Sequence, residues 1–118
     1  MNIEQFRNYC LNKKGVTESF PFDEYVLVFK VLHKMFALTS LKSETLIISL
    51  KCNPERALNL REDYESIVPA FHLNKKHWSS VAIESLNNDK LAMELIDHSY
   101  ELVVKGMTKK DKILLQSL

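Results

Sequence analysis

The sequence predicts a single α+β domain over residues 1–118, in which an antiparallel sheet of about five strands packs against helices. The length of 118 residues fits one domain. Apolar residues make up 46% and charged residues 26% of the chain, which is typical of a folded globular protein. Strand-like segments follow one another between helical segments instead of alternating strictly with them, and this order favours an antiparallel sheet.

The first element is expected to be a helix from about residue 3 to residue 14. Apolar residues recur at helical spacing from Ile3 to Cys10, behind Asn2, which is a good N-cap. Gly15 follows the last turn, where a left-handed residue commonly ends a helix. The N-terminal segment is therefore predicted to be a helix that stops before Gly15.

An ordered link and a hairpin are expected next. The segment 17–23 should not be flexible, because Phe20 and Phe22 are expected to cover other residues. Residues Tyr25–Thr39 are rich in Val, Phe and Leu but too long for one strand in a domain of this size. A break at Leu32 and the residue after it would make two antiparallel strands, although no Gly or Asn marks the turn.

The middle of the chain is predicted to contain three strands and one helix. Thr45–Leu50 is expected to be the third strand. The helix over Asn53–Tyr64 begins with an Asn cap followed by proline. Ile67–Phe71 is expected at a sheet edge because Pro69 cannot donate a ladder hydrogen bond, and Trp78–Ile83 is expected to be the last strand.

Two helices are predicted at the C-terminal end. The longer one begins at Asn87 to Asp89, buries a stripe that starts at Ala92, and ends at Gly106. A short final helix begins at Thr108, whose spacing to Asp111 is that of a capping box.

Several classes of function are excluded by the composition. The only two glycines, Gly15 and Gly106, are far apart, so the chain has no glycine-rich phosphate loop. Cys10 and Cys52 are too few for a disulfide framework and are expected to be buried thiols. No apolar run approaches the roughly 20 residues that a bilayer needs, and the N-terminus lacks the features of a signal peptide. We expect a cytoplasmic protein without a membrane partner and without a cofactor.

Two acid-free segments are the candidate functional regions. Residues 25–43 carry three lysines, and residues 66–83 carry two lysines, two histidines and the only tryptophan, although the net charge of the whole chain is only +1. Lysines of this kind can contact phosphates while an aromatic ring rests on a base. The alternative is an ordinary solvated lysine face with the tryptophan in the core. The candidate nucleic-acid-binding residues are Lys30, Lys34, Lys42, Lys75, Lys76, His77 and Trp78.

Other chemistry in the sequence is less well supported. A small-ligand pocket could include His72, Asn74 and Arg61, although a structural role for Arg61, as an ion-pair partner of Asp63 or Glu65, is favoured. A metal site on His72 and His77, which are five residues apart, lacks the paired His and Cys spacing of zinc sites. Cys52 beside a helix start is the only candidate nucleophile. Consecutive helical residues point about 100° apart, so the run Asp-His-Ser at 97–99 cannot form a catalytic triad. We therefore expect no enzyme.

The order of short motifs along nearly the whole chain resembles the MmcQ/YjbR family of small bacterial proteins. These motifs are Phe20-Pro21-Phe22-Asp23, Val28-Phe29-Lys30-Val31, Lys34-Met35-Phe36-Ala37, Leu50-Lys51-Cys52-Asn53-Pro54-Glu55, Leu60-Arg61-Glu62-Asp63-Tyr64, Pro69-Ala70-Phe71-His72-Leu73-Asn74-Lys75-Lys76-His77-Trp78 and Asp97-His98-Ser99-Tyr100. The resemblance implies a single α+β domain with a curved, CyaY-like antiparallel sheet. It also implies DNA binding by two hairpins that act as a double wing.

The leading hypothesis is therefore a non-enzymatic protein that binds DNA weakly and without strong sequence preference. The rival hypothesis is a protein-interaction or chaperone-like module that uses the apolar sheet face or the link around Phe20 and Phe22. A large exposed apolar patch would favour the rival, whereas a lysine-lined groove would favour nucleic acid.

Overall fold

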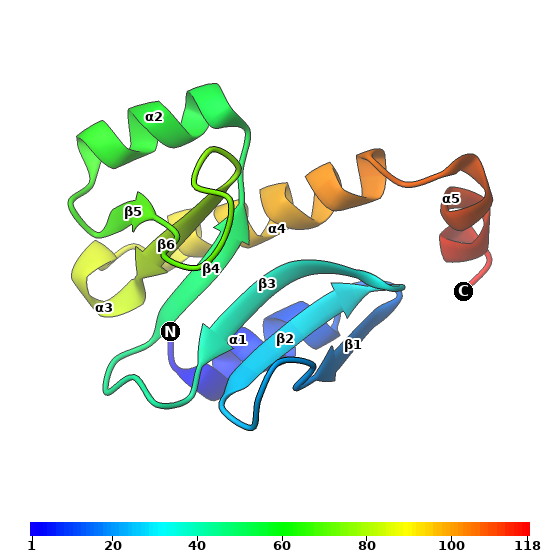
Figure 1. Ribbon diagram of the computed structural model, residues 1–118, viewed down its shortest axis with the longest axis horizontal. Helices are drawn as coiled ribbons and strands as arrows, with labels where there is room; N and C mark the ends of the chain where they lie inside the picture. Colours follow the sequence, from blue (N-terminus) through cyan, green and yellow to red (C-terminus); the bar gives the residue numbers. More distant parts are fainter.

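Five helices and one six-stranded antiparallel sheet make up the computed structural model, which describes all 118 residues (Figure 1). The helices are α1 (Ile3–Leu11), α2 (Pro54–Asp63), α3 (Ile83–Leu86), α4 (Asp89–Lys105) and α5 (Lys109–Gln116). The strands are β1 (Val16–Ser19), β2 (Val26–Val31), β3 (Lys34–Ser40), β4 (Ile47–Lys51), β5 (Ile67–Pro69) and β6 (Trp78–Ala82). They lie in the order β1-β2-β3-β4-β6-β5. The predicted α+β class is confirmed, with one strand more than the expected five.

The extra strand is β1, which lies partly in the segment expected to be a link. Helix α1 ends at Leu11 rather than near residue 14, and Gly15 adopts the left-handed conformation, with φ 74°. The chain thereby turns into β1, whose Val16–Ser19 pair with β2. Phe20 is 47% and Phe22 is 65% exposed, so both rings keep solvent-exposed surface beside the sheet.

The hairpin of β2 and β3 turns at Leu32 and His33, as predicted. Val31 pairs with Lys34, so the turn has only two residues, and Leu32 adopts φ 55° although it is not glycine. The register shifts between Phe29 and Lys30 because β3 carries an extra residue there. The predicted hairpin is confirmed, and its irregular backbone is a feature that the spacing did not indicate.

One side of the sheet is covered by helices and forms the core. Phe6 of α1 meets Phe29 of β2 edge to face, with ring centroids 5.3 Å apart. The predicted stripe of α4 is buried from Ala92 to Val103 and packs against β3 and β4. No helix lies over the side of the sheet that faces the viewer in Figure 1. The sheet therefore has one helix-covered face and one face without a helix.

The remaining elements agree with the prediction except at α3. Asn53 caps α2 and Thr108 caps α5 through side-chain oxygens that accept backbone N–H groups. β5 lies at the sheet edge, as its proline required. The last strand ends at Ala82, one residue earlier than predicted, and is followed by α3, a single helical turn that the sequence did not indicate. None of the five helices has the length and apolar character needed to cross a bilayer.

Candidate functional site

The face of the sheet that no helix covers is the candidate site, and we call it the open face. Ser49 and Ser80 lie opposite each other on β4 and β6 with their hydroxyl oxygens 3.2 Å apart, whereas their neighbours Ile48 and Val81 are in the core. Because side chains alternate along strands, the register fixes the other members of this face. With Ser49 and Ser80 included, the strand positions of the open face are Thr17, Ser19, Val26, Val28, Lys30, Met35, Leu38, Ser40, Ile47, Ser49, Lys51, Val68, Trp78, Ser80 and Ala82.

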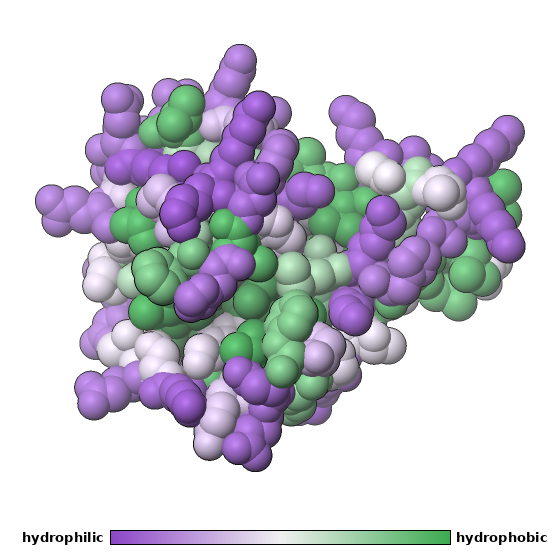
Figure 2. All heavy atoms as spheres, viewed as in Figure 1, coloured by the Kyte–Doolittle hydropathy of each residue, from purple (hydrophilic) through white to green (hydrophobic).

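The open face carries positive charge and no negative charge. None of its strand positions is an Asp or Glu, while Lys30 and Lys51 contribute two ammonium groups and five other positions carry hydroxyls. Its remaining positions are apolar, and Figure 2 shows an apolar area in the middle of the face with hydrophilic residues around it. The face can thus attract an anion and also bury apolar or aromatic groups.

Four of the predicted residues lie on or next to the open face. Lys30 and Trp78 belong to it, and both are half-buried. Trp78 is therefore neither a fully exposed ring nor a fully buried core residue. Lys76 is exposed in the loop that leads to Trp78, and the adjacent His77 is half-buried.

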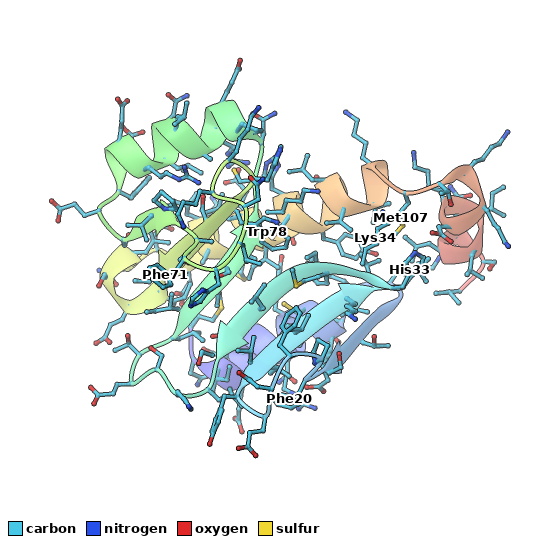
Figure 3. The ribbon with its side chains drawn as sticks, in the orientation of Figure 1. Phe20, His33, Lys34, Phe71, Trp78 and Met107 are labelled. Atoms are coloured by element: carbon cyan, nitrogen blue, oxygen red, sulfur yellow. The ribbon has the colours of Figure 1, made fainter.

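Lys34 and Lys42 lie away from this face. Lys34 is at the β2–β3 turn, and its register partner Val31 belongs to the core, so its side chain is on the helix-covered side, near α5 (Figure 3). The ammonium group of Lys42 lies over the ring of Tyr25, 3.9 Å from its centroid. In the sheet, β4 separates the two hairpins. The five predicted lysines therefore do not form one continuous patch.

The loop over residues 70–77 uses several predicted site residues to hold its own shape. Lys75 Nζ donates to the carbonyl oxygens of Ala70 and Phe71 at 3.1 and 3.0 Å. The side-chain oxygen of Asn74 accepts the backbone N–H groups of residues 76 and 77. Arg61 reaches across from α2 and donates to the carbonyl oxygen of Lys75 at 2.7 Å and to Ser79 Oγ at 2.9 Å. The side chains of Arg61, Asn74 and Lys75 are thus committed to positioning the loop.

The exposed part of this loop is aromatic and basic. Phe71 is 79% exposed, and the ring of His72 meets it edge to face at 4.5 Å. A cavity of about 690 Å³ is lined by none of His72, Asn74 and Arg61. It lies between the N-terminal residues, the β3–β4 connection and α3. Of the three residues of the predicted pocket, His72 and Asn74 belong to the loop and Arg61 contacts it from α2, and none of them lines this cavity.

The other two arginines are held in ion pairs, and the cysteine near α2 is buried. Arg7 pairs with Glu18 at 2.5 Å, and Arg56 pairs with Glu94 at 2.6 Å. Cys52 is only 5% exposed, and burial raises the pKa of its thiol, which lowers its thiolate fraction at neutral pH. With Arg61 bound to the loop, all three arginines are occupied.

Similarity to known proteins agrees with this architecture. A family model described as YjbR matches residues 11–102. The chain belongs to the YjbR family. The uncharacterized protein YjbR of Escherichia coli K12 is 32% identical over the full length of both chains. The uncharacterized protein YyaQ of Bacillus subtilis is 35% identical and covers 84% of this chain and 95% of its own.

A solved structure shares nearly the whole fold of this YjbR-family protein. The crystal structure of the Deinococcus radiodurans protein DR2400, a DUF419 domain, superposes with a TM-score of 0.90 at 41% identity. The superposition covers 98% of this chain and 88% of the other. The resemblance that the motifs indicated is confirmed for both family and fold.

Two groups of lysines in this YjbR-family protein were not anticipated. Lys51 lies on the open face, and the alternation from Ile47 through Ser49 could have placed it there. Three further lysines lie on α5, at positions 109, 110 and 112. His33 Nε2 is 3.3 Å from a carboxylate oxygen of Asp111, so α5 lies against the β2–β3 turn.

Proposed function

We propose that this YjbR-family protein is a non-enzymatic DNA-binding protein whose contact surface is the open face of the sheet. The observation that carries the proposal is the charge pattern of that face, which combines Lys30 and Lys51 with hydroxyls and Trp78 and contains no acid. Lysines neutralise phosphates, and hydroxyls donate hydrogen bonds to phosphate oxygens. A surface free of carboxylates does not repel the polyanion.

Binding of this kind is expected to be weak and tolerant of sequence. Arginine is the side chain that most often reads guanine in the major groove. Arg7, Arg56 and Arg61 are all held by protein partners, and the net charge of the chain is only +1. Attraction therefore comes from a local surface rather than from a general field, and base identity contributes little.

A different set of residues from the predicted one makes the contact in this proposal. Lys30, Lys76, His77 and Trp78 remain, and Lys51 joins them. Lys75 is left out because its ammonium group is used by loop carbonyls. Lys34 and Lys42 lie beyond the face and could touch only a longer strand.

A second candidate function is a protein-interaction module that buries the apolar part of the same face. Ile47 and Val68 are 39% and 48% exposed there, and Phe71 is 79% exposed beside it. Exposed apolar residues that gather on one face are typical of interaction sites. This candidate uses the apolar residues, whereas DNA binding depends on the lysines, so variants separate the two.

The test is a titration of fluorescently labelled DNA at several salt concentrations, read by anisotropy and by the emission of Trp78, the only tryptophan. Wild type should bind at low salt, with an affinity that falls steeply as salt rises. Lys30→Ala with Lys51→Ala should weaken binding and reduce the salt slope by about 1.5, since each lost contact removes about 0.7 to 0.9.

Lys90→Ala with Lys105→Ala is the matched control, because it removes the same charge from exposed positions on α4. The control should keep most of the affinity. Equal losses in the two double variants would mean that only net charge matters and that the open face is not the site. Absence of binding by wild type at low salt would overturn DNA binding and favour the protein-interaction module.

A further inference from the structure

We propose that the strand recognised by the open face is single-stranded, with bases stacked on Trp78 and Phe71 and phosphates at Lys30 and Lys51. This inference rests on the proposed function and specifies its partner. It requires aromatic rings that a base can reach, a path of cations across the sheet, and hairpins that do not act as free wings.

The aromatic rings lie at one end of the open face. The backbone N–H of Ala70 donates to the carbonyl oxygen of Trp78 at 3.0 Å, which brings Phe71, the next residue, beside the strand that carries Trp78. Figure 3 shows Phe71 and Trp78 on the same half of the molecule. The ring of Phe71 is 79% exposed, so a base stacked on it would remove apolar surface from water, which is favourable. A duplex hides the faces of its bases in the stack, whereas a single strand offers them.

The cations form a row with Trp78 across the strands. Thr17 pairs with Lys30, and Lys30 pairs with Met35 across β2 and β3. Lys51 pairs with Trp78 across β4 and β6. On its other side, the preceding residue Leu50 pairs with Ala37 of β3. Lys51 therefore lies level with the β3 bulge, next to Met35. A strand that crosses the sheet along this row meets two ammonium groups and then the indole ring.

Neither hairpin is free to enter a groove of duplex DNA. At the β2–β3 turn, His33 contacts Asp111, and a side chain added at Gly15 would touch both Leu32 and Leu115 of α5. The turn is thus packed against α5. The loop over 70–77 is held by Lys75 and by Arg61. A double wing needs projecting tips, and both of these connections are tied to the body of the protein.

The partner chemistry follows from these three observations. It is single-stranded DNA, a flexible polyanion with unpaired aromatic bases. With no free arginine and only stacking and phosphate contacts, it should be recognised without strong base preference. The lysine row orients the backbone, and the aromatic pair holds the bases.

The experiment compares four probes at one low salt concentration: oligothymidylate and oligouridylate of about 12 nucleotides, a DNA duplex of the same length, and an abasic deoxyribose-phosphate strand. The wild-type protein should bind oligothymidylate at least about tenfold more tightly than either the duplex or the abasic strand. Oligothymidylate should also change the emission of Trp78, because stacking alters the surroundings of the indole. Binding of oligouridylate that is clearly tighter than binding of oligothymidylate would overturn DNA as the occupant of the face and favour RNA.

Phe71→Ser is the decisive variant, and Leu58→Ser is its control. Both residues are well exposed, at 79% and 63%, so both variants should fold, but Leu58 lies on α2 away from the open face. Phe71→Ser should weaken oligothymidylate binding about fivefold or more and leave duplex binding unchanged. Leu58→Ser should change neither.

Each remaining outcome decides a different question. Duplex binding equal to or tighter than oligothymidylate binding would overturn the single-strand inference while the proposed function stands. Equal binding of the abasic strand and oligothymidylate would overturn the stacking argument. No binding of any probe would overturn the proposed function itself.

Discussion

The two faces of the sheet carry different kinds of residues on the same strands. On β4, Ile48 and Leu50 point into the core and are 0% and 2% exposed, whereas Ser49 and Lys51 between and after them lie on the open face. The buried residues of the helix-covered face are mostly apolar, whereas the open face mixes lysine, hydroxyl and apolar groups. If the open face binds DNA as proposed, stability and binding depend on opposite sides of the same strands, and a substitution should affect one property without the other.

Ser99 of α4 binds the backbone of two neighbouring strands, β3 and β4. Its hydroxyl donates to the carbonyl oxygen of Phe36 at 2.6 Å and accepts the backbone N–H of Lys51 at 2.9 Å. The first bond occupies the carbonyl at the β3 bulge, and the second fixes the backbone of a residue whose side chain lies on the open face. A fully buried serine on the helix side therefore supports the position of a lysine on the other side.

The largest effect should come from Phe29→Ala on the helix-covered face. Phe29 is fully buried against Phe6, and the loss of a buried phenylalanine costs about 3–5 kcal/mol of unfolding free energy. The neighbouring Lys30→Ala on the open face should change stability by less than about 0.5 kcal/mol but weaken DNA binding. Urea denaturation measures the first property and anisotropy the second. Similar stability losses at the two positions would contradict the division between the faces.

Ser99→Ala should have an intermediate effect. It leaves a buried carbonyl and a part-buried N–H without their partner, and an unsatisfied group of this kind costs about 1–3 kcal/mol. Ser80→Ala on the open face is the control, because its hydroxyl can be replaced by water and its loss should cost less than half as much. Hydrogen exchange should show faster exchange at the amide of Lys51 in Ser99→Ala alone. Unchanged exchange at Lys51 would mean that Ser99 does not hold β4.

Much of this fold could be predicted because its signals are local. The Asn53 and Thr108 caps and the α4 stripe mark helices by the chemistry of single turns. Strand β1 was missed because it has only four residues and its position depends on distant partners. It pairs with β2, and its Glu18 is held by Arg7 of α1. Neither contact can be inferred from the spacing around Val16.

The site could be predicted only in part, because spacing shows where lysines occur but not what their ammonium groups bind. Acid-free segments placed Lys30 and Trp78 correctly in strands, and alternation now puts both on the open face. The same reasoning included Lys75, which binds loop carbonyls, and Lys42, which lies over Tyr25. Lys51 was not predicted, because it lies outside the two acid-free segments and close to the start of α2.

The smallest effect should be a pH dependence at His98, which lies on the helix side. His98 Nε2 accepts the backbone N–H of Asn53 at 3.1 Å, so the neutral ring holds the start of α2 against α4. Burial lowers the pKa of His98, and the nearby charge of Arg56 lowers it further, while Glu94 and Glu101 oppose this. The unfolded chain therefore binds the proton more readily than the folded protein. The stabilisation is present above the unfolded pKa of about 6.5 and is lost as pH falls below it.

His98→Gln tests this dependence, because glutamine can still accept a hydrogen bond but does not titrate. Urea denaturation at about pH 7.5 and about pH 5.5, on either side of the unfolded pKa, should show a smaller loss of stability in His98→Gln than in wild type. His72→Gln, at an exposed ring, should keep the wild-type loss. DNA binding measured at pH 7.5 should be unchanged in His98→Gln, since His98 lies on the helix side and contacts Asn53. A wild-type pH dependence in His98→Gln would mean that other groups dominate it and that the contact with Asn53 does not depend on the proton.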